Sequence, residues 1–291
     1  MKKPRSIRTT LVIMAAVAII IYAVFFMEHS APEPTEQNAA GELIVTFIDI
    51  GQGDSELIQQ GDNAVLIDTG EYSQRQILTD TLGSLGVTSL DYVIATHPHS
   101  DHIGSMNVII DSYDVRHVMM PYATANTVSF QKMLESISKK GLHIEHPAPG
   151  SSIRAGNIEL EILAPNSDKY EDTNDISIIT RLQWGATAFI FEGDAEALSE
   201  KEVLNKGFNV SADVIKIGHH GSSSSSSDAY LDAVNPRAAV ITCGQGNVYG
   251  HPHKEVLDRL SIRNIAVYRT DTMGTITMRS NGTDITVETQ K

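Results

Sequence analysis

Cysteine is almost absent from this chain of 291 residues, and Cys243 is the only one. A single thiol cannot form an internal disulfide, and nothing around it suggests a redox function. Cys243 lies in the apolar segment Ala-Ala-Val-Ile-Thr-Cys-Gly, which predicts a buried strand, so we expect it to act as a small apolar side chain. An apolar content of 41% is sufficient for a sizeable core in one large domain or two small ones.

Basic residues are also scarce. The chain has 22 Lys and Arg against 36 Asp and Glu, and its formal net charge is −14. Four of the basic residues lie within residues 1–27, which contain no acid, so the rest of the chain carries 18 basic and 36 acidic residues. Such a surface repels polyanions unless metal ions or a local basic patch offset it. This composition counts against tight non-specific binding of nucleic acid, but it does not exclude cleavage at a cationic centre.

Several catalytic signatures are missing as well. The sequence shows no Ser-His-Asp arrangement, no phosphate-binding P-loop and no dinucleotide fingerprint. It also shows no internal repeat with a period of roughly 20–50 residues, which argues against a solenoid.

The first 27 residues are not expected to belong to the folded domain. Residues 1–9 form a basic stub, and residues 10–27 carry no charge. That uncharged length is at the lower edge of a membrane-spanning helix and exceeds most signal-peptide cores. We therefore expect a single-pass anchor in the cell membrane with a cytoplasmic N-terminus. Cleavage of a signal and secretion is the alternative, and in either case the domain lies outside the cytoplasm. Residues 28–41 predict a linker, and residues 42–291 the folded domain.

Short apolar runs and helical stretches alternate through this domain. The sequence predicts strands at 43–50, 56–60, 64–68, 91–96, 158–163, 177–184, 187–191, 213–217, 238–242, 265–268, 275–279 and 284–288. It predicts helices at 73–85, 103–111 and 126–140, and another that starts near His253. Strand clusters in both halves, each interrupted by helices, indicate two sheets packed face to face with helices outside.

The densest group of potential metal ligands follows the predicted strand at 91–96. The segment from His97 to His102 holds three imidazoles and a carboxylate within six residues. These groups suit zinc, manganese or iron, and four of them exceed what one ion needs from one segment. We predict a two-metal site, with His97 and His99 on one ion and Asp101 and His102 on the other. A histidine-rich surface turn is the alternative.

Two further predicted strands end in potential ligands. Asp194 follows the run Ala-Thr-Ala-Phe-Ile-Phe-Glu-Gly, where a carboxylate could bridge two cations, although capping of the following helix is a reasonable alternative. His219 and His220 follow the run Val-Ile-Lys-Ile-Gly, and we expect one of them to complete the coordination of the second metal.

Six motifs together resemble the metallo-β-lactamase superfamily of two-metal hydrolases. In chain order they are FIDIGQGDSELIQ (47–59), LIDTG (66–70), THPHSDHIG (96–104), FIFEGDA (189–195), VIKIGHHGS (214–222) and NVYGHPH (247–253). The motifs GQGD, GHHGS and YGHP narrow the resemblance to the metallo-hydrolase domain of ComEC-type DNA-uptake proteins. It covers about residues 42–285. The resemblance implies a four-layer αββα sandwich, two divalent ions (Zn or Mn), and Asp194 as the bridging ligand.

The resemblance also implies roles for residues around the ligands. It favours His220 as the metal ligand, with His219 supporting it from outside the ligand set, and we expect His219 to protonate the leaving group. Asp68 is expected behind the metal loop, where it orients the ligand imidazoles. Asp54 belongs to the branch signature, and for it a structural turn and a contact with the site stay equally open.

Substrate contacts are predicted at two places. His251 is interpreted as a donor to a substrate phosphate oxygen, or else as a ligand of the second metal. The six serines from Ser222 to Ser227 predict a flexible linker on composition alone. After the histidine pair, they instead suggest a loop over the mouth of the site in which Ser222 meets a phosphate.

One departure from the superfamily pattern concerns the first metal. Many members supply a further histidine between the two main motifs, and here that region contains Asn174, Asp175 and Ser177 instead. We expect Asn174 and Ser177 to support the site from outside the ligand set. Asp175 or a water would fill the missing position, and an oxygen-rich site shifts preference from zinc towards manganese.

The expected function is that of an extracytoplasmic two-metal hydrolase, either a phosphodiesterase or a deoxyribonuclease. Asp101, His219 and His251 are the expected catalytic groups. The substrate would be single-stranded DNA or a phosphodiester polymer of the cell envelope. The membrane is the other expected contact, through the N-terminal helix, and no obligate protein partner is inferred. A lactam or lactone hydrolase and a non-catalytic metal-binding module are the alternatives.

Overall fold

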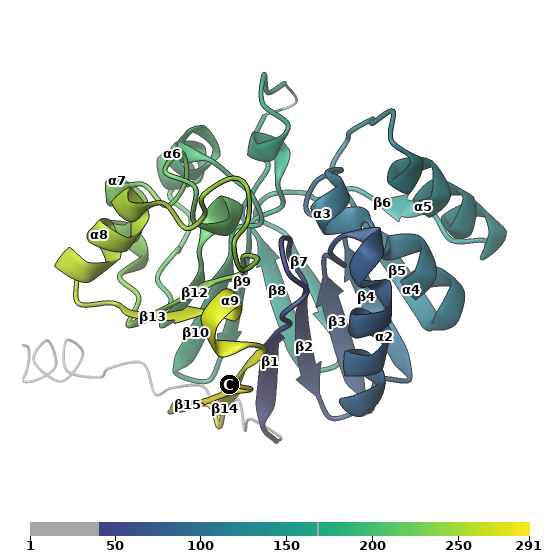
Figure 1. Ribbon diagram of the computed structural model, residues 1–291, viewed down its shortest axis with the longest axis horizontal. Coiled ribbons are helices and arrows are strands. Elements are labelled where there is room, and N and C mark those ends of the chain that lie inside the picture. The colour runs from purple at the N-terminus through teal and green to yellow at the C-terminus, as the bar shows by residue number, and fades with distance from the viewer. Residues whose placement is uncertain (1–40, 168) are drawn as a thin grey trace, which may run out of the picture. The chain divides into compact units, whose positions relative to one another are not determined.

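The computed structural model describes residues 41–167 and 169–291, and it is shown in Figure 1. The predicted basic stub, the predicted span at 10–27 and all but one residue of the predicted linker lie outside the described residues. Across the described ranges, no helix has the length and apolar character needed to cross a membrane.

The strands form two sheets. The first has the order β15-β14-β1-β2-β3-β4-β5-β6, and the second has the order β13-β12-β11-β10-β9-β8-β7. The strands of the first sheet are β1 (Leu43–Phe47), β2 (Glu56–Gln60), β3 (Asn63–Ile67), β4 (Ser89–Ile94), β5 (Asp114–Met119), β6 (Ile144–Glu145), β14 (Ile276–Ser280) and β15 (Ile285–Thr289). Those of the second are β7 (Ser152–Ala155), β8 (Ile158–Ile162), β9 (Thr180–Trp184), β10 (Thr187–Phe191), β11 (Val214–Lys216), β12 (Ala238–Ile241) and β13 (Ala266–Arg269).

Strands β3, β10 and β12 are buried on both faces, which explains why their sequences are almost entirely apolar. Side chains alternate along a strand, so Phe189 and Phe191 of β10 pack between the sheets while Ile190 packs against the outer helices. Phe47 of β1 meets Phe191 across the two sheets with ring centroids 6.1 Å apart. Full burial of one such side chain contributes about 1.5–3 kcal/mol.

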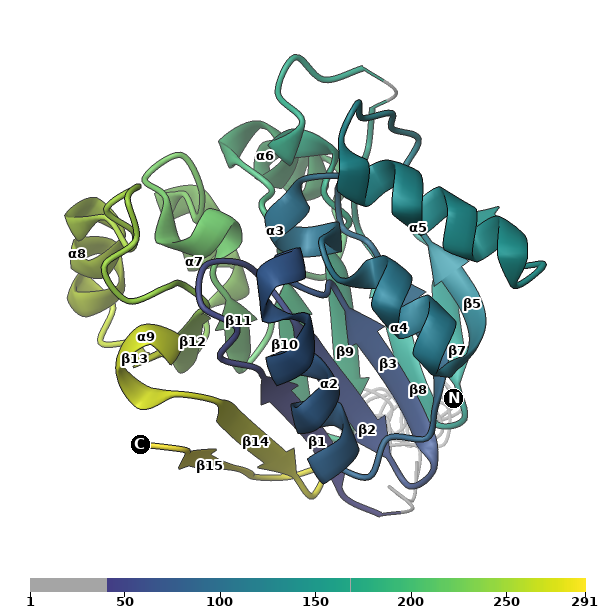
Figure 2. The ribbon, with the colours of Figure 1, turned by 45° about the vertical axis from the view of Figure 1, so that its right-hand side comes forward.

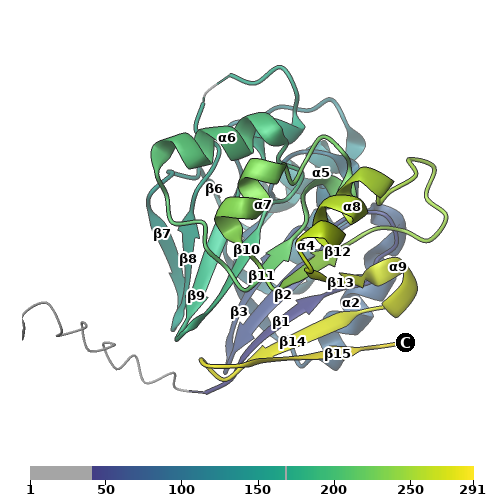
Figure 3. The same ribbon diagram turned by 90° about the vertical axis from the view of Figure 1, so that its left-hand side faces the viewer.

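Helices cover the outer face of each sheet. The helices are α2 (Arg75–Ser84), α3 (Ser100–Ile103), α4 (Met106–Ser112), α5 (Val128–Lys139), α6 (Ala197–Lys206), α7 (Asp228–Val234), α8 (Lys254–Ile262) and α9 (Thr270–Met273), and the short 3-10 turns are η1 (Tyr72–Gln74), η2 (Asn174–Ile176) and η3 (Gly218–Gly221). Helices α2, α4 and α5 bury apolar side chains against the first sheet (Figure 2), and α6, α7 and α8 do so against the second (Figure 3). The predicted αββα sandwich is therefore confirmed.

Two of the predicted elements need correction. The predicted helix at 103–111 is two short helices, α3 and α4, and α3 begins inside the histidine motif at Ser100. The predicted strand at 177–184 begins only at Thr180, because Ser177 closes the η2 turn with a hydrogen bond from its N–H to the Asn174 carbonyl (3.0 Å). Strands β5, β6 and β7 were not predicted, since they are short or carry polar side chains at exposed positions.

The strand directions determine where function can be placed. Strands β3, β4 and β5 are parallel in the first sheet, and β10, β11 and β12 are parallel in the second. The carboxyl ends of parallel strands share one edge of a sheet, where loops leave the core and ligand sites form. Five of the six motifs of the sequence analysis include or follow such strand ends, and the sixth, at 47–59, follows β1, which pairs antiparallel with β14 and β2.

Candidate metal centre

The Asp194 carboxylate lies at the centre of the histidine cluster. Its Oδ2 atom is 3.2 Å from His102 Nε2, 3.5 Å from His220 Nε2, and 3.8 Å from both His97 Nε2 and His219 Nε2. The first sheet supplies His97 and His102 through the loop after β4, and the second supplies Asp194 and the histidine pair through the loops after β10 and β11. Asp194 therefore lies between groups from both sheets, as a bridging carboxylate must.

Potential ligand atoms gather in two groups that share Asp194. One group contains His97 and His99, and the other contains His102 and His220 together with Asp54; within each group all the ligand atoms lie within 4.8 Å of one another. His97 Nε2 is 3.0 Å from His99 Nδ1, and Asp101 Oδ2 is 3.3 Å from His220 Nε2. The first group agrees with the predicted pairing of His97 and His99, whereas the second holds His102 and His220 without Asp101, so ligation itself stays a prediction.

Unpaired buried atoms show that these residues fit a pair of divalent cations. Within the described part of the chain, His102 Nε2, His220 Nε2 and Asp194 Oδ1 are buried and have no hydrogen-bond partner. A buried polar atom without a partner costs about 1–3 kcal/mol, so such atoms are rare unless another group binds them. All three belong to residue types that bind zinc, manganese or iron.

Asp68 holds His102 from the side away from Asp194. Its Oδ2 accepts a hydrogen bond from His102 Nδ1 (2.7 Å) and another from the Thr96 hydroxyl (2.6 Å), while its Oδ1 accepts from the Thr96 N–H (2.8 Å). A proton on Nδ1 leaves the His102 Nε2 lone pair directed at Asp194. The position of Asp68 agrees with the predicted orienting role.

Asp54 also lies behind the imidazoles rather than among the ligands. Its carboxylate faces His220 Nδ1 (3.2 Å) and His102 Nδ1 (3.9 Å), whereas Asp194 and Asp101 face the Nε2 atoms. Although Asp54 is close enough to be counted in the second group, its oxygens are bonded to Lys216 and Thr242. Asp54 therefore contacts the site from behind the imidazoles, which answers the question that the sequence left open.

Gly53 explains how Asp54 reaches this position. Gly53 has φ +131°, and a Cβ there would overlap the carbonyl oxygen of Asp101. The Asp54 N–H donates to that same carbonyl (3.2 Å). The Gly-Gln-Gly-Asp motif thus lets the β1–β2 loop pack directly against the histidine loop.

Lys216 balances the charge of Asp54. Burial alone would raise the pKa of Asp54, but Lys216 and His220 hold it well below its usual range. Burial would likewise lower the pKa of Lys216, and Asp54 instead raises it. Both groups are therefore charged at neutral pH, and the Lys216 ammonium also donates to the Gly193 carbonyl (3.0 Å) next to Asp194.

The two adjacent histidines have different surroundings. His220 is 1% exposed, and its Nδ1 lies 3.0 Å from the Thr242 carbonyl, so its Nε2 points at Asp194 and Asp101. The side chain of His219 is 24% exposed, and its Nδ1 lies 3.2 Å from Glu196. This geometry favours His220 as the ligand and leaves His219 on the open side, as predicted.

His251 also lies on the open side. Its ring centroid is 5.4 Å from that of His219 and 6.1 Å from that of His220. Burial and the neighbouring His220 lower the pKa of His251 to about 4, so the imidazole is neutral near pH 7. His253 N-caps α8, as the predicted helix start requires. The role of His251 towards substrate stays a prediction.

The serine run is an ordered loop and not a flexible linker. Ser225 and Ser226 are fully buried, and the N–H groups of Ser226 and Ser227 donate to Glu200. The first half of the run adjoins the metal centre, because the Ser224 hydroxyl donates to Glu196 (2.8 Å) and contacts Ser222. Contact between Ser222 and a phosphate stays a prediction.

The region without the expected histidine supports the site in three ways. The Ser177 hydroxyl accepts from the Asp194 N–H (3.2 Å), and the Asn174 amide lies 3.4 Å from His219 Nδ1. Asp175 accepts from two N–H groups at the start of α6. Its carboxylate thus holds the start of α6, and the role of Asp175 as the replacement ligand stays a prediction.

Three residues of the site were not predicted from the sequence. Lys216 is a charged residue inside the apolar run Val-Ile-Lys-Ile, which is a signal of a buried ion pair. Glu196 follows Asp194 by two residues, but only the fold shows that it contacts His219. Thr242 contributes its hydroxyl to Asp54 and its carbonyl to His220, and its type gives no local signal.

Comparisons with known proteins bear on the family and the fold of this chain. The sequence model described as "Metallo-beta-lactamase superfamily" matches residues 48–245. "ComE operon protein 3" of Bacillus subtilis is 33% identical over 255 residues, which covers 81% of this chain and 33% of that protein. "Competence protein ComA" of Neisseria gonorrhoeae is 29% identical, with coverage of 84% and 33%. The chain thus spans about a third of the length of these two relatives.

A solved structure shares the fold. The metallo-beta-lactamase fold protein YhfI from Bacillus subtilis superposes with a TM-score of 0.55 over 84% of this chain and 100% of its own, at 14% sequence identity. An identity this low shows a common architecture and carries no information about substrate.

Proposed function

The chain belongs to the metallo-beta-lactamase superfamily, and from that premise we propose that it is a metal-dependent phosphodiesterase whose substrate is single-stranded DNA or another phosphodiester. The observation that carries the proposal is the sharing of Asp194 between two groups of ligand atoms, with buried lone pairs that nothing else satisfies. When bound there, a pair of divalent cations supplies Lewis acidity and lowers the pKa of water towards neutrality. Two-metal sites of this kind occur in phosphatases and nucleases.

The open side of the centre supplies groups for the rest of the reaction. Glu196 fixes the His219 ring through Nδ1, which leaves Nε2 facing the space next to Asp194. In the proposed reaction, His219 holds the proton that the leaving oxygen takes up. The neutral His251 imidazole donates a hydrogen bond to a non-bridging phosphate oxygen. Asp101 Oδ2 lies beside His220 Nε2 and would be a further ligand of the cation that this nitrogen holds.

The names of the relatives support the choice of substrate. The relative from Neisseria gonorrhoeae is named a competence protein, and this is carried over as a proposal that the chain acts on DNA during uptake. The same proposal includes an extracytoplasmic position and attachment to the membrane through residues 10–27. A phosphodiester of the cell envelope fits the same chemistry and the acidic composition.

Hydrolysis assays with the metal-loaded protein test the proposal. The purified chain, loaded with Mn²⁺ or Zn²⁺, is assayed on bis(p-nitrophenyl) phosphate and on labelled single-stranded DNA beside a His97→Ala control. Metal-dependent cleavage of both substrates supports a nuclease, and cleavage of the small diester alone points to an envelope phosphodiester. Two bound metals without either activity would overturn the proposal in favour of a lactam, lactone or binding function.

A further inference from the structure

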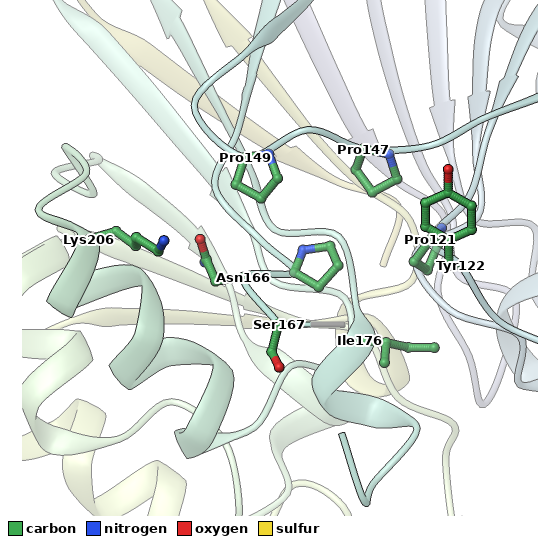
Figure 4. A pocket seen from close by; sticks show the side chains of 9 residues that line it. Pro121, Tyr122, Pro147, Pro149, Asn166, Ser167, Ile176 and Lys206 are labelled. Carbon is green, nitrogen blue, oxygen red and sulfur yellow. The ribbon is translucent and has the colours of Figure 1, made fainter. Parts of the chain in front are cut away.

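A pocket of about 510 Å³ is lined by the segments after β5, β6 and β8, by the η2 turn and by the end of α6 (Figure 4). This volume falls within the range of about 300–1,000 Å³ that ligand sites occupy. Its walls include the rings of Pro121, Pro147, Pro149 and Pro165. Proline rings present flat apolar surfaces on a backbone whose φ is restricted, so the pocket is largely preformed.

The pocket and the metal centre share a wall. Ile176 lines the pocket, and it belongs to the η2 turn whose Asn174 contacts His219. Pro121 follows β5, which pairs in parallel with β4 so that Ile94 lies opposite Met119. Since β4 leads into His97, the histidine loop after β4 and the pocket loop after β5 leave the same edge of the first sheet. The η2 turn therefore connects the pocket to the metal centre.

Tyr122 gives the pocket an aromatic surface. Its side chain is 80% exposed, and its ring stacks on His146 with centroids 3.5 Å apart and planes inclined by 24°. His146 is fixed in turn, because its Nδ1 lies 2.9 Å from the Met120 carbonyl. The fixed His146 imidazole thus covers one face of the Tyr122 ring. The exposed ring is therefore preorganised to stack with a second partner.

Two polar groups lie across the pocket from Tyr122 (Figure 4). Lys206 forms no salt bridge or hydrogen bond with any residue in the ranges 41–167 and 169–291, so its ammonium is available to an anion. Asn166 donates through Nδ2 to the Leu163 carbonyl (2.6 Å), and its buried Oδ1 has no partner among the same residues. The pocket therefore combines a stacking surface, an unpaired acceptor and a cation.

We propose that this pocket is a nucleobase subsite next to the reacting phosphodiester. The base stacks on Tyr122, its N–H edge donates to Asn166 Oδ1, and the phosphate attached to that nucleotide pairs with Lys206. This assignment rests on the proposed function and specifies its substrate as a nucleic acid. It also fits the acidic composition, because a single stacked base and one lysine can hold a short segment of strand without a basic surface.

Binding of thymidylyl-thymidine to the full chain tests the subsite separately from hydrolysis. The affinity is measured by calorimetry in the His97→Ala background, where turnover is blocked. Adding Tyr122→Ala should weaken binding roughly 5- to 150-fold, because stacking of one base contributes that much, while the matched Tyr122→Phe should leave it unchanged. Lys206→Ala should weaken binding and reduce its dependence on salt. An analogue of thymidylyl-thymidine that lacks both bases should bind weakly to every variant.

The outcomes separate the subsite from the proposed function. Equal affinities in the Tyr122→Ala and Tyr122→Phe variants, or no binding to the His97→Ala protein, would overturn the subsite even if the wild type cleaves diesters. A loss of affinity in Tyr122→Ala but not in Tyr122→Phe would support the subsite even if the wild type cleaves no diester. In that case only the proposed function would fail.

Discussion

Lys216 and Asp54 form an ion pair in which the side chains are 1% and 0% exposed. The pair joins the end of β11 to the β1–β2 loop, and so connects the two sheets directly behind His102 and His220. Breaking a buried pair leaves one charge without compensation, which costs far more than the net contribution of the pair itself. The site thus depends on an ion pair that lies behind the ligand imidazoles.

Lys216→Met should destabilise the fold by about 3–5 kcal/mol, because the Asp54 carboxylate would stay buried without its partner. The double variant Lys216→Met with Asp54→Asn should recover much of that loss, since neither charge is then buried. The free energy of unfolding in urea, measured for metal-free protein, checks both. A double variant as unstable as the sum of the single variants would contradict the ion-pair argument.

Glu56 should make stability depend on pH. Burial, and then the negative charge of Asp54, raise the pKa of Glu56 well above its usual value. The unfolded chain ionises Glu56 above about pH 4.5, so this stabilising contribution is complete below that pH and is lost as pH rises towards the folded-state pKa. The glutamine of Glu56→Gln stays neutral in both states. The free energy of unfolding of this variant minus that of the wild type should therefore increase by up to about 1.4 kcal/mol for each unit by which the pH rises. Urea unfolding near pH 4 and near pH 8 measures this, and a difference that does not change with pH would refute it.

Asp194→Ala should lose metal and activity together. A residue that only supports a metal ligand contributes about 10- to 100-fold to metal affinity or activity. Removal of the shared Asp194 carboxylate should therefore lower both quantities by more than about 100-fold. Metal content by plasma spectrometry and hydrolysis of a small diester give the two readouts. His117→Ala, at a surface position on β5, serves as the control. Activity retained with full metal content would rule out the bridging assignment.

Asp68→Asn should weaken metal binding about 10- to 100-fold without unfolding the protein, because an amide cannot hold the His102 Nδ1 proton as a carboxylate does. Asp62→Asn in the exposed β2–β3 turn is the matched control, with the same substitution far from the site. Competition with a chelator measures the affinity. Equal affinities in the two variants would show that Asp68 has no orienting role.

His219→Asn should separate proton transfer from metal binding. If His219 protonates the leaving oxygen, the variant keeps its metals and loses roughly 100- to 10,000-fold in rate on DNA. The rate of the variant on bis(p-nitrophenyl) phosphate should fall much less, because p-nitrophenolate leaves without a proton. The ratio of the two kcat values is the measurement. Equal losses on both substrates, together with lost metal, would make His219 a ligand.

Elements with strong local signals were predicted well. The strands predicted at 56–60 and 187–191 coincide with β2 and β10, and β10 is largely apolar because it is buried on both faces. Strand β5 was missed, since Arg116 and His117 face outward and interrupt its apolar pattern. The break between α3 and α4 was also missed, because it depends on Gly104 packing closely against the backbone of Glu71 and Tyr72, which are distant in sequence.

The sequence by itself determined the type and order of the groups that face the metals, because each ligand follows directly after an apolar strand and the motifs are local. Only the tertiary structure decided which nitrogen of each imidazole points where, and that Asp54 lies behind the ligands while Asp101 lies among them. It also decided that Lys216 and Glu196 belong to the site, and that four prolines and Tyr122 form a pocket that the η2 turn connects to it. These relationships join residues from both sheets, so they arise from packing and register, which no local pattern encodes.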